Sequence, residues 1–236
     1  MKKLITILAF ITEVILLPQA IADSSVTSEI KSNKSNQALR MPMYQPPRRG
    51  APNIRVGGGT RGISGEVPSI HVLAPDHVGL TDNEQPTLSW YMSKSNPMRL
   101  EILVIDEEGI EPLLELTLKP SDLNKGMHSI DLAKHGVKLK SGVKYQWSVI
   151  MVAEEGRRSG DIVSSGMIER RKLTNALQAK LKKASSHEDV FIYAQEGYWY
   201  DAISKLTGLI KKNPDNETLK EQHAQLLSQI GLSNLK

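Results

Sequence analysis

Short apolar segments recur between residues 67 and 172, and this pattern constrains the fold of the 236-residue chain more than any other feature of its sequence. Their length and spacing, with polar turns between them, are typical of an antiparallel β-sandwich. Over residues 100–105, one face of an extended chain would be wholly apolar, as expected for a strand that packs on a core. The predicted strands are 69–73, 87–92, 99–106, 113–118, 126–131, 144–153 and 162–170. The region 67–172 is therefore predicted to form a β-sandwich.

Two tryptophans, Trp90 and Trp147, fall inside these predicted strands. In the later strand, alternation places Tyr145 and Val149 on the same side as Trp147, which predicts that this side faces the core. A tryptophan on an early strand, packed under a late strand that carries a tyrosine, resembles the fibronectin type III pattern. The resemblance implies a sandwich of the immunoglobulin or fibronectin III type.

Helical periodicity follows the last predicted strand. Apolar residues from Leu173 to Leu181 recur at the i, i+4 spacing of one helix face. Ser186 and Asp189 stand at the spacing of a capping box, so a second helix is predicted to begin there. Residues 173–236 are therefore predicted to be helical.

Part of this helical region resembles a tetratricopeptide repeat (TPR). The matching residues are Tyr193, Gly197, Trp199, Ala202, Leu206, Leu209 and Pro214. Only the second half of the repeat matches, and such units need about three copies to bury a continuous core. We therefore expect these helices to lean on the β domain, on another copy of the chain or on a partner. The predicted fold class is α+β, with an N-terminal β-sandwich followed by a small TPR-like helical hairpin.

The first 22 residues have the three parts of a secretory signal peptide. Lys2 and Lys3 precede an apolar run over residues 4–17, and a small-x-small motif ends at Ala22. The run is shorter than the roughly 20 residues that a membrane-spanning helix needs. Cleavage is expected after Ala22, and the chain is predicted to be periplasmic or secreted and not membrane-anchored.

The segment after the signal peptide, residues 23–66, is predicted to be a disordered, basic, Pro/Gly-rich linker because it shows no apolar periodicity. The whole chain has a net charge of +4, which is too mild to indicate a nucleic-acid partner. It has no cysteine, which excludes disulfides, thiolate catalysis and thiolate metal ligands. Its stability is therefore expected to come from packing.

Several motifs together resemble an uncharacterised bacterial family, domain of unknown function 928. The motifs lie at 46–52, 55–62, 80–91, 145–147, 166–170 and 197–202. The most specific are the run Gly-Gly-Gly-Thr-Arg-Gly at 57–62 and the run Trp-Tyr-Asp-Ala at 199–202. Met167 stands where an aromatic residue is expected, which affects packing. The resemblance implies an exported protein with this domain order and implies no reaction.

The glycine run is the first candidate site. It lacks the Lys-Ser or Lys-Thr step and the following helix of a phosphate-binding loop, so we expect a flexible joint with Arg61 as an interaction residue that contacts a carboxylate. The histidines show no metal-ligand spacing, and the closest cluster is His71, Asp76 and His77. No metal and no cofactor are predicted.

The remaining candidates are carboxylates and aromatic residues. The carboxylates at 106–108 and 154–155 are expected in exposed hairpin turns, where they make poor general acids. Tyr198 and Tyr200 are candidate interaction residues, because an exposed tyrosine at either position could bind sugar or peptide. Core packing is the usual use of aromatic residues at helical spacing, and it is the favoured alternative.

No motif for chemistry emerges from these candidates. The sequence therefore favours an exported, non-catalytic interaction or scaffolding protein of the bacterial periplasm that binds a protein partner or itself. The alternative is a glycan or cell-wall binding module. A further alternative is a hydrolase with dispersed catalytic residues, which a pocket joining His71, Asp76 and His77 to a buried carboxylate would favour.

Overall fold

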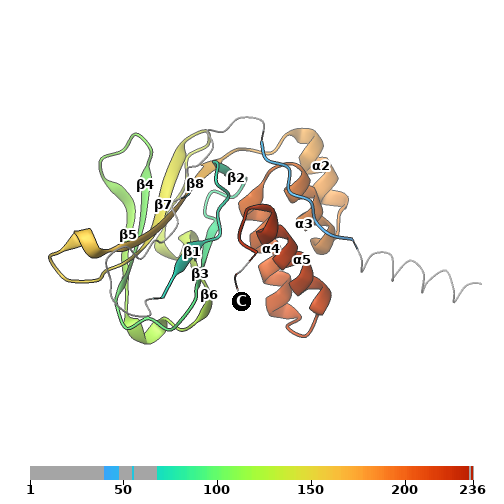
Figure 1. Ribbon diagram of the computed structural model, residues 1–236. Coiled ribbons are helices and arrows are strands. Elements are labelled where there is room, and N and C mark those ends of the chain that lie inside the picture. The colour runs from blue at the N-terminus through green and yellow to red at the C-terminus, as the bar shows by residue number, and fades with distance from the viewer. Residues whose placement is uncertain (1–39, 48–54, 56–67, 234, 236) are drawn as a thin grey trace, which may run out of the picture. The chain divides into compact units, whose positions relative to one another are not determined.

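The computed structural model of the protein describes residues 40–47, 55, 68–233 and 235. The described residues from Met41 onward belong to one compact unit, in which strands come first and helices follow (Figure 1). The predicted α+β class is confirmed. The predicted signal peptide with Ala22, and the glycine run with Arg61, lie outside the described residues.

The described strands form two sheets. They are β1 (Ile70–Val72), β2 (Gly79–Thr81), β3 (Thr87–Met92), β4 (Leu100–Asp106), β5 (Pro112–Leu118), β6 (Gly126–Asp131), β7 (Lys144–Met151) and β8 (Ile162–Arg170). One sheet has the order β1-β3-β6, and the other has the order β2-β8-β7-β4-β5. β2 pairs with β8 in parallel, whereas the pairs around β7 are antiparallel. The seven predicted strands are confirmed, and β2 is a short strand that the sequence pattern did not predict.

Alternation along β4 and β7 explains why these strands share a core. Leu100, Ile102 and Val104 are fully buried, and Val104 pairs in register with Trp147 of β7. Tyr145 lies on the same face as Trp147 and is also buried. The apolar faces predicted from the sequence are confirmed, and the large aromatic rings add much of the apolar area that this core removes from water.

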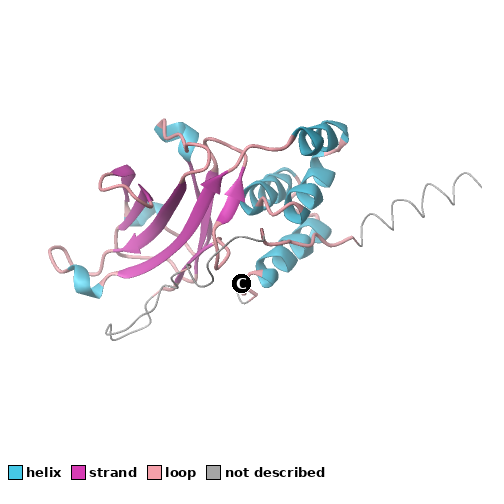
Figure 2. Cartoon of the chain, turned by 90° about the horizontal axis from the view of Figure 1, so that it is seen from above, coloured by secondary structure: helices cyan, strands magenta, loops and turns pink. Residues whose placement is uncertain are grey.

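The helices follow the last strand and lie beside the strands (Figure 2). They are α2 (Asn175–Lys183), α3 (Ser186–Gln195), α4 (Trp199–Lys212) and α5 (Glu217–Gln229). A capping box of Ser185 and Glu188 begins α3, one residue before the predicted pair Ser186 and Asp189. The longer glutamate side chain reaches back to the Ser185 N–H at 2.7 Å, which explains the shift. No helix within the described residues is both long and apolar enough to span a membrane.

Aromatic side chains join the helices to the strands. The indole N–H of Trp147 donates to the Tyr200 hydroxyl at 2.9 Å, and that hydroxyl donates to the Met167 carbonyl at 3.0 Å. The indole N–H of Trp199 donates to the Leu73 carbonyl at 2.8 Å. All three bonds are buried, where a donor or acceptor left without its partner costs about 1–3 kcal/mol. We expected the helices to lean on the β domain, on another copy or on a partner, and these bonds show that they lean on the β strands.

Residues 41–47, which we call the N-terminal strap, bond to two of the helices. The Gln45 N–H donates to the Ala194 carbonyl of α3 at 3.0 Å. The Tyr44 N–H donates to the side-chain oxygen of Gln229 of α5 at 2.7 Å. The prediction of a linker disordered throughout is wrong for the strap, because the buried Tyr44 ring anchors it to the core.

Candidate functional site

Every tyrosine and every tryptophan of the chain is buried, so the described surface offers no aromatic platform. Tyr198 is 5% exposed and Tyr200 is 2% exposed. Tyr198 packs edge-on against Tyr193 and donates its hydroxyl to the Lys172 carbonyl at 3.3 Å. Both rings therefore pack in the core, which is the alternative that the sequence favoured, and neither is exposed as an interaction residue.

The strap completes a hydrogen-bonded array of three ionisable side chains. The Tyr44 hydroxyl lies 2.8 Å from Nε2 of His77, and Nδ1 of His77 lies 3.1 Å from Oδ1 of Asp76. The Tyr44 and His77 rings stack at 5.8 Å between centroids, and Trp199 meets Tyr44 edge-on at 5.0 Å. Hydroxyl, imidazole and carboxylate thus follow one another in the order of a nucleophilic triad.

The environment of this array indicates a structural role, in which the three side chains hold the strap in place. Burial, reinforced by the neighbouring Tyr200 and Asp76, raises the pKa of the Tyr44 hydroxyl far above its usual range, so this group keeps its proton. The Asp76 side chain at the other end is 59% exposed, so the array itself contains no buried carboxylate. We therefore assign the array to holding the strap against the β1–β2 loop.

His71 stands apart from the array. Its Nε2 lies 3.2 Å from the Ser69 hydroxyl, and burial lowers its pKa, as does the nearby charge of Arg55. Arg55 itself donates to the carbonyls of Ala74 at 3.2 Å and Ile230 at 2.8 Å, which ties the β1–β2 loop to the end of α5. Among the residues that the structure describes, no group of His, Asp and Glu could hold a metal ion.

A buried carboxyl group joins α4 to β2. Asp201 accepts a hydrogen bond from the Asp82 N–H at 3.0 Å and another from the Thr81 hydroxyl. Burial nevertheless raises the pKa of Asp201 to about 7, because desolvation outweighs the two hydrogen bonds. The hollow beside it measures about 120 Å³ and is also lined by Ser204 and Lys205. That volume suits water or a small ion rather than an organic substrate.

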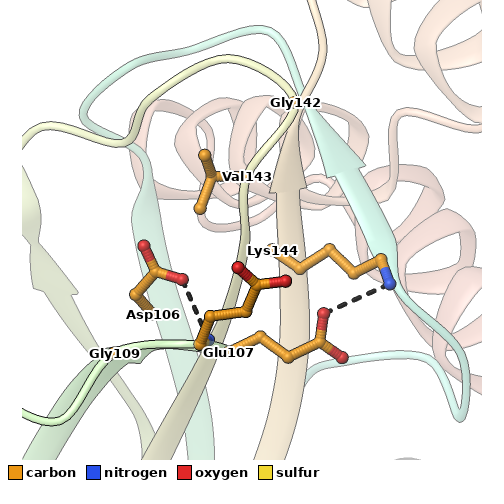
Figure 3. A pocket seen from close by; sticks show the side chains of 7 residues that line it. Asp106, Glu107, Gly109, Gly142, Val143 and Lys144 are labelled. Atoms are coloured by element: carbon orange, nitrogen blue, oxygen red, sulfur yellow. Dashed lines mark hydrogen bonds and ion pairs between the residues drawn. The ribbon is translucent and has the colours of Figure 1, made fainter.

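A larger hollow, of about 340 Å³, opens beside the turn between β4 and β5 (Figure 3). Here Glu107 pairs with Lys144 at 3.2 Å, and Asp106 accepts from the Glu108 N–H at 3.1 Å. The Glu107 and Lys144 side chains are both nearly half exposed, so their pair contributes less than about 1 kcal/mol. These contacts shape the turn, and they leave its carboxylates in open contact with solvent.

The strand that follows this turn, β5, is an open edge of the five-stranded sheet. In the described part of the chain, no backbone group pairs with the outer side of β5. Its inward side chains, Leu114, Leu116 and Leu118, are only partly buried. Leu113 is 37% exposed, and Ile110 in the preceding turn is 96% exposed. A bare edge with apolar side chains is a template for pairing with another chain, which makes β5 the candidate interaction surface.

The sequence predicted this strand correctly, but it did not predict that the strand lies at the edge of the sheet. Alternating leucines are typical of any half-buried strand, whereas an edge position depends on how distant segments pair. The strap and Asp201 were also missed. The available signal for the strap was Tyr44, a large aromatic residue within a polar, proline-rich stretch.

Comparison with known proteins adds a family. The family model described as Domain of Unknown Function (DUF928) matches residues 56–236, which is most of the chain. This match confirms the resemblance predicted from the sequence motifs. A search of curated proteins finds no match.

Proposed function

The chain belongs to the DUF928 family, and from this premise we propose that it is an exported, non-catalytic interaction or scaffolding protein of the bacterial periplasm. In this proposal it binds a protein partner through the β5 edge. The observation that carries the proposal is the open edge, where a seven-residue strand with half-covered leucines has no described neighbour on its outer side. A partner strand would satisfy the backbone groups and cover the leucines together.

The finer fold identity is part of the same proposal. We propose that the two sheets are related to the immunoglobulin and fibronectin III sandwiches, because Trp90 and Trp147 lie buried in different sheets. We also propose that α3 and α4 are related to a TPR helix pair. Gly197 between them adopts a positive φ of 81°, and Trp199 and Ala202 are fully buried at the start of α4.

The glycan-binding alternative has lost the residues that motivated it. Stacking on a sugar needs an exposed aromatic face, and each tyrosine and tryptophan is buried. A protein partner needs no such face, because strand addition uses main-chain hydrogen bonds.

Site-specific photo-cross-linking in cells tests the proposed edge. A photoreactive residue at Leu113, which is 37% exposed on β5, is expected to give a discrete adduct with a protein. The matched control is Met127 on β6, which is 43% exposed on an edge of the other sheet. Adducts at Leu113 and none at Met127 support the proposal.

The mass of the adduct identifies the partner as a second copy or another protein, and both support an interaction role. Absence of adducts at Leu113 over a range of expression levels would overturn it. Equal adducts at Leu113 and Met127 would also count against a specific edge.

Export is tested separately. The chain recovered from the periplasmic fraction is expected to begin at Asp23, because cleavage after Ala22 removes the signal peptide. N-terminal sequencing checks this, and a chain that keeps Met1 in the cytoplasm would contradict export.

A further inference from the structure

We propose that the β5 edge binds a second copy of this chain, by antiparallel pairing of β5 with β5 around a two-fold axis at Thr117. This inference rests on the proposed function and deepens it by naming the partner. A two-fold interface must be self-complementary, so the sequence of the edge itself determines which registers are favourable.

The extended edge reaches one residue beyond β5. Lys119 has φ −78° and ψ 149°, which continues the strand. Pro120 then begins a short 3-10 helix and has no N–H to donate, so pairing ends there. Pro112 opens the strand at the other end. The register with β4 shifts between Leu114 and Pro112, so Leu113 lies in an irregular step and residues 114–119 are the regular segment available to a second strand.

The sheet faces limit the registers. Glu115 and Thr117 lie on the outer face of the sheet, and Leu114 and Leu116 lie on the inner face. A slip of one residue would bring outer residues opposite inner ones, so a symmetric pair must be centred on a single residue. The central candidates are Glu115, Leu116 and Thr117.

Centring on Thr117 gives the most favourable cross-strand pairs. Glu115 of one copy then lies opposite Lys119 of the other, and this ion pair occurs twice by symmetry. Leu116 lies opposite Leu118, also twice, and the two Thr117 side chains face each other at the axis. Opposite charges, paired aliphatic residues and paired threonines are all stabilising cross-strand neighbours.

The other two registers are poorer. Centring on Glu115 places the two Glu115 carboxylates directly opposite each other, which is destabilising. Centring on Leu116 places Lys119 opposite the apolar Leu113 and leaves Glu115 opposite Thr117. The register around Thr117 is thus the one in which both charged residues of the edge meet an opposite charge.

Cysteine cross-linking tests the axis directly, since the chain has no cysteine of its own. In Thr117→Cys the two sulfhydryl groups face each other across one strand spacing, where Cα atoms about 5 Å apart allow a disulfide. Mild oxidation of the purified exported variant is expected to give a disulfide-linked dimer that reductant dissolves. The matched control is Leu113→Cys, whose two copies lie about 27 Å apart in this register and should stay monomeric.

Charge exchange tests the same register without a new bond. Glu115→Lys places like charges opposite each other twice and is expected to weaken dimerisation by about tenfold in sedimentation equilibrium. Adding Lys119→Glu restores the opposite charges and is expected to restore the dimer. The Glu115 carboxylate also interacts electrostatically with Arg158 of its own copy, so the single substitution could act within one chain. Rescue of the dimer by the double variant is therefore the decisive readout.

Three outcomes overturn the inference. One is a wild-type chain that remains monomeric up to about 100 μM together with a Thr117→Cys variant that forms no disulfide. Another is a Glu115→Cys variant that cross-links while Thr117→Cys does not, which would assign a different axis. The third is failure of the double charge variant to recover the dimer. A monomeric chain that still gives Leu113 adducts with another protein overturns self-association and leaves the proposed function standing.

Discussion

The two edges of the five-stranded sheet are finished in opposite ways. β2 at one edge is three residues long and is covered by α4, whose Tyr200 packs on Gly79 and whose Asp201 bonds to Asp82. β5 at the other edge is seven residues long and has no described neighbour on its outer side. Native sheets protect edges by short strands or by covering elements, and β2 shows both devices. The helices therefore serve the chain's own fold at one edge, whereas the opposite edge is the one to which we assign a partner in the proposed function.

Among the packing changes, the largest effect is expected where the covered edge is tightest. A Cβ atom at Gly79 would lie 2.7 Å from the Tyr200 ring and 3.2 Å from Pro75. The ring cannot move aside, because its hydroxyl is bonded to Trp147 and Met167 in the core. Gly79→Ala is therefore expected to lower the free energy of unfolding by about 1–3 kcal/mol, as overpacked cores do, in a denaturant titration.

The matched control lies in the same helix as Tyr200. An added Cβ at Gly208 of α4 meets nothing within 4 Å, so Gly208→Ala should raise the free energy of unfolding by about 0.5–1 kcal/mol through helix propensity alone. A Gly79→Ala variant as stable as the wild type would show that α4 is not seated firmly on β2.

The carboxyl group at the covered edge predicts a pH dependence. The pKa of Asp201 is raised to about 7, against about 3.9 in an unfolded chain, so the folded state binds the proton more tightly. Its contribution to stability is complete below about pH 4 and is lost as the pH rises to about 7, at roughly 1.4 kcal/mol per pH unit.

Asp201→Asn removes this titration while keeping an acceptor for the Asp82 N–H. The difference in unfolding free energy between the variant and the wild type should therefore grow in favour of the variant from pH 4 to pH 7, in parallel denaturant titrations. Parallel pH profiles for the two proteins would show that the carboxyl group is not desolvated in the folded state.

The contrast between the edges also marks what the sequence could and could not predict. β4 was predictable because its side chains alternate locally, as at Leu100, Ile102 and Val104. β2 was not, because this strand exists through its parallel pairing with β8, which is distant in the sequence. The buried state of Tyr200 depends on a donor from Trp147, 53 residues away, and no local pattern contains that information.

The smallest change in the free energy of unfolding is expected at the bare β5 edge. This small change would show most directly that the two edges differ. Leu113→Thr changes a residue of β5 that is 37% exposed, and threonine suits a strand as well as leucine does. At low protein concentration, where the chain is monomeric, we expect the free energy of unfolding to change by less than about 0.5 kcal/mol. Denaturant titrations of this variant and of Gly79→Ala under the same conditions make the two edges directly comparable. A loss at Leu113 as large as the loss at Gly79 would mean that the chain itself covers β5, and the two edges would then no longer differ.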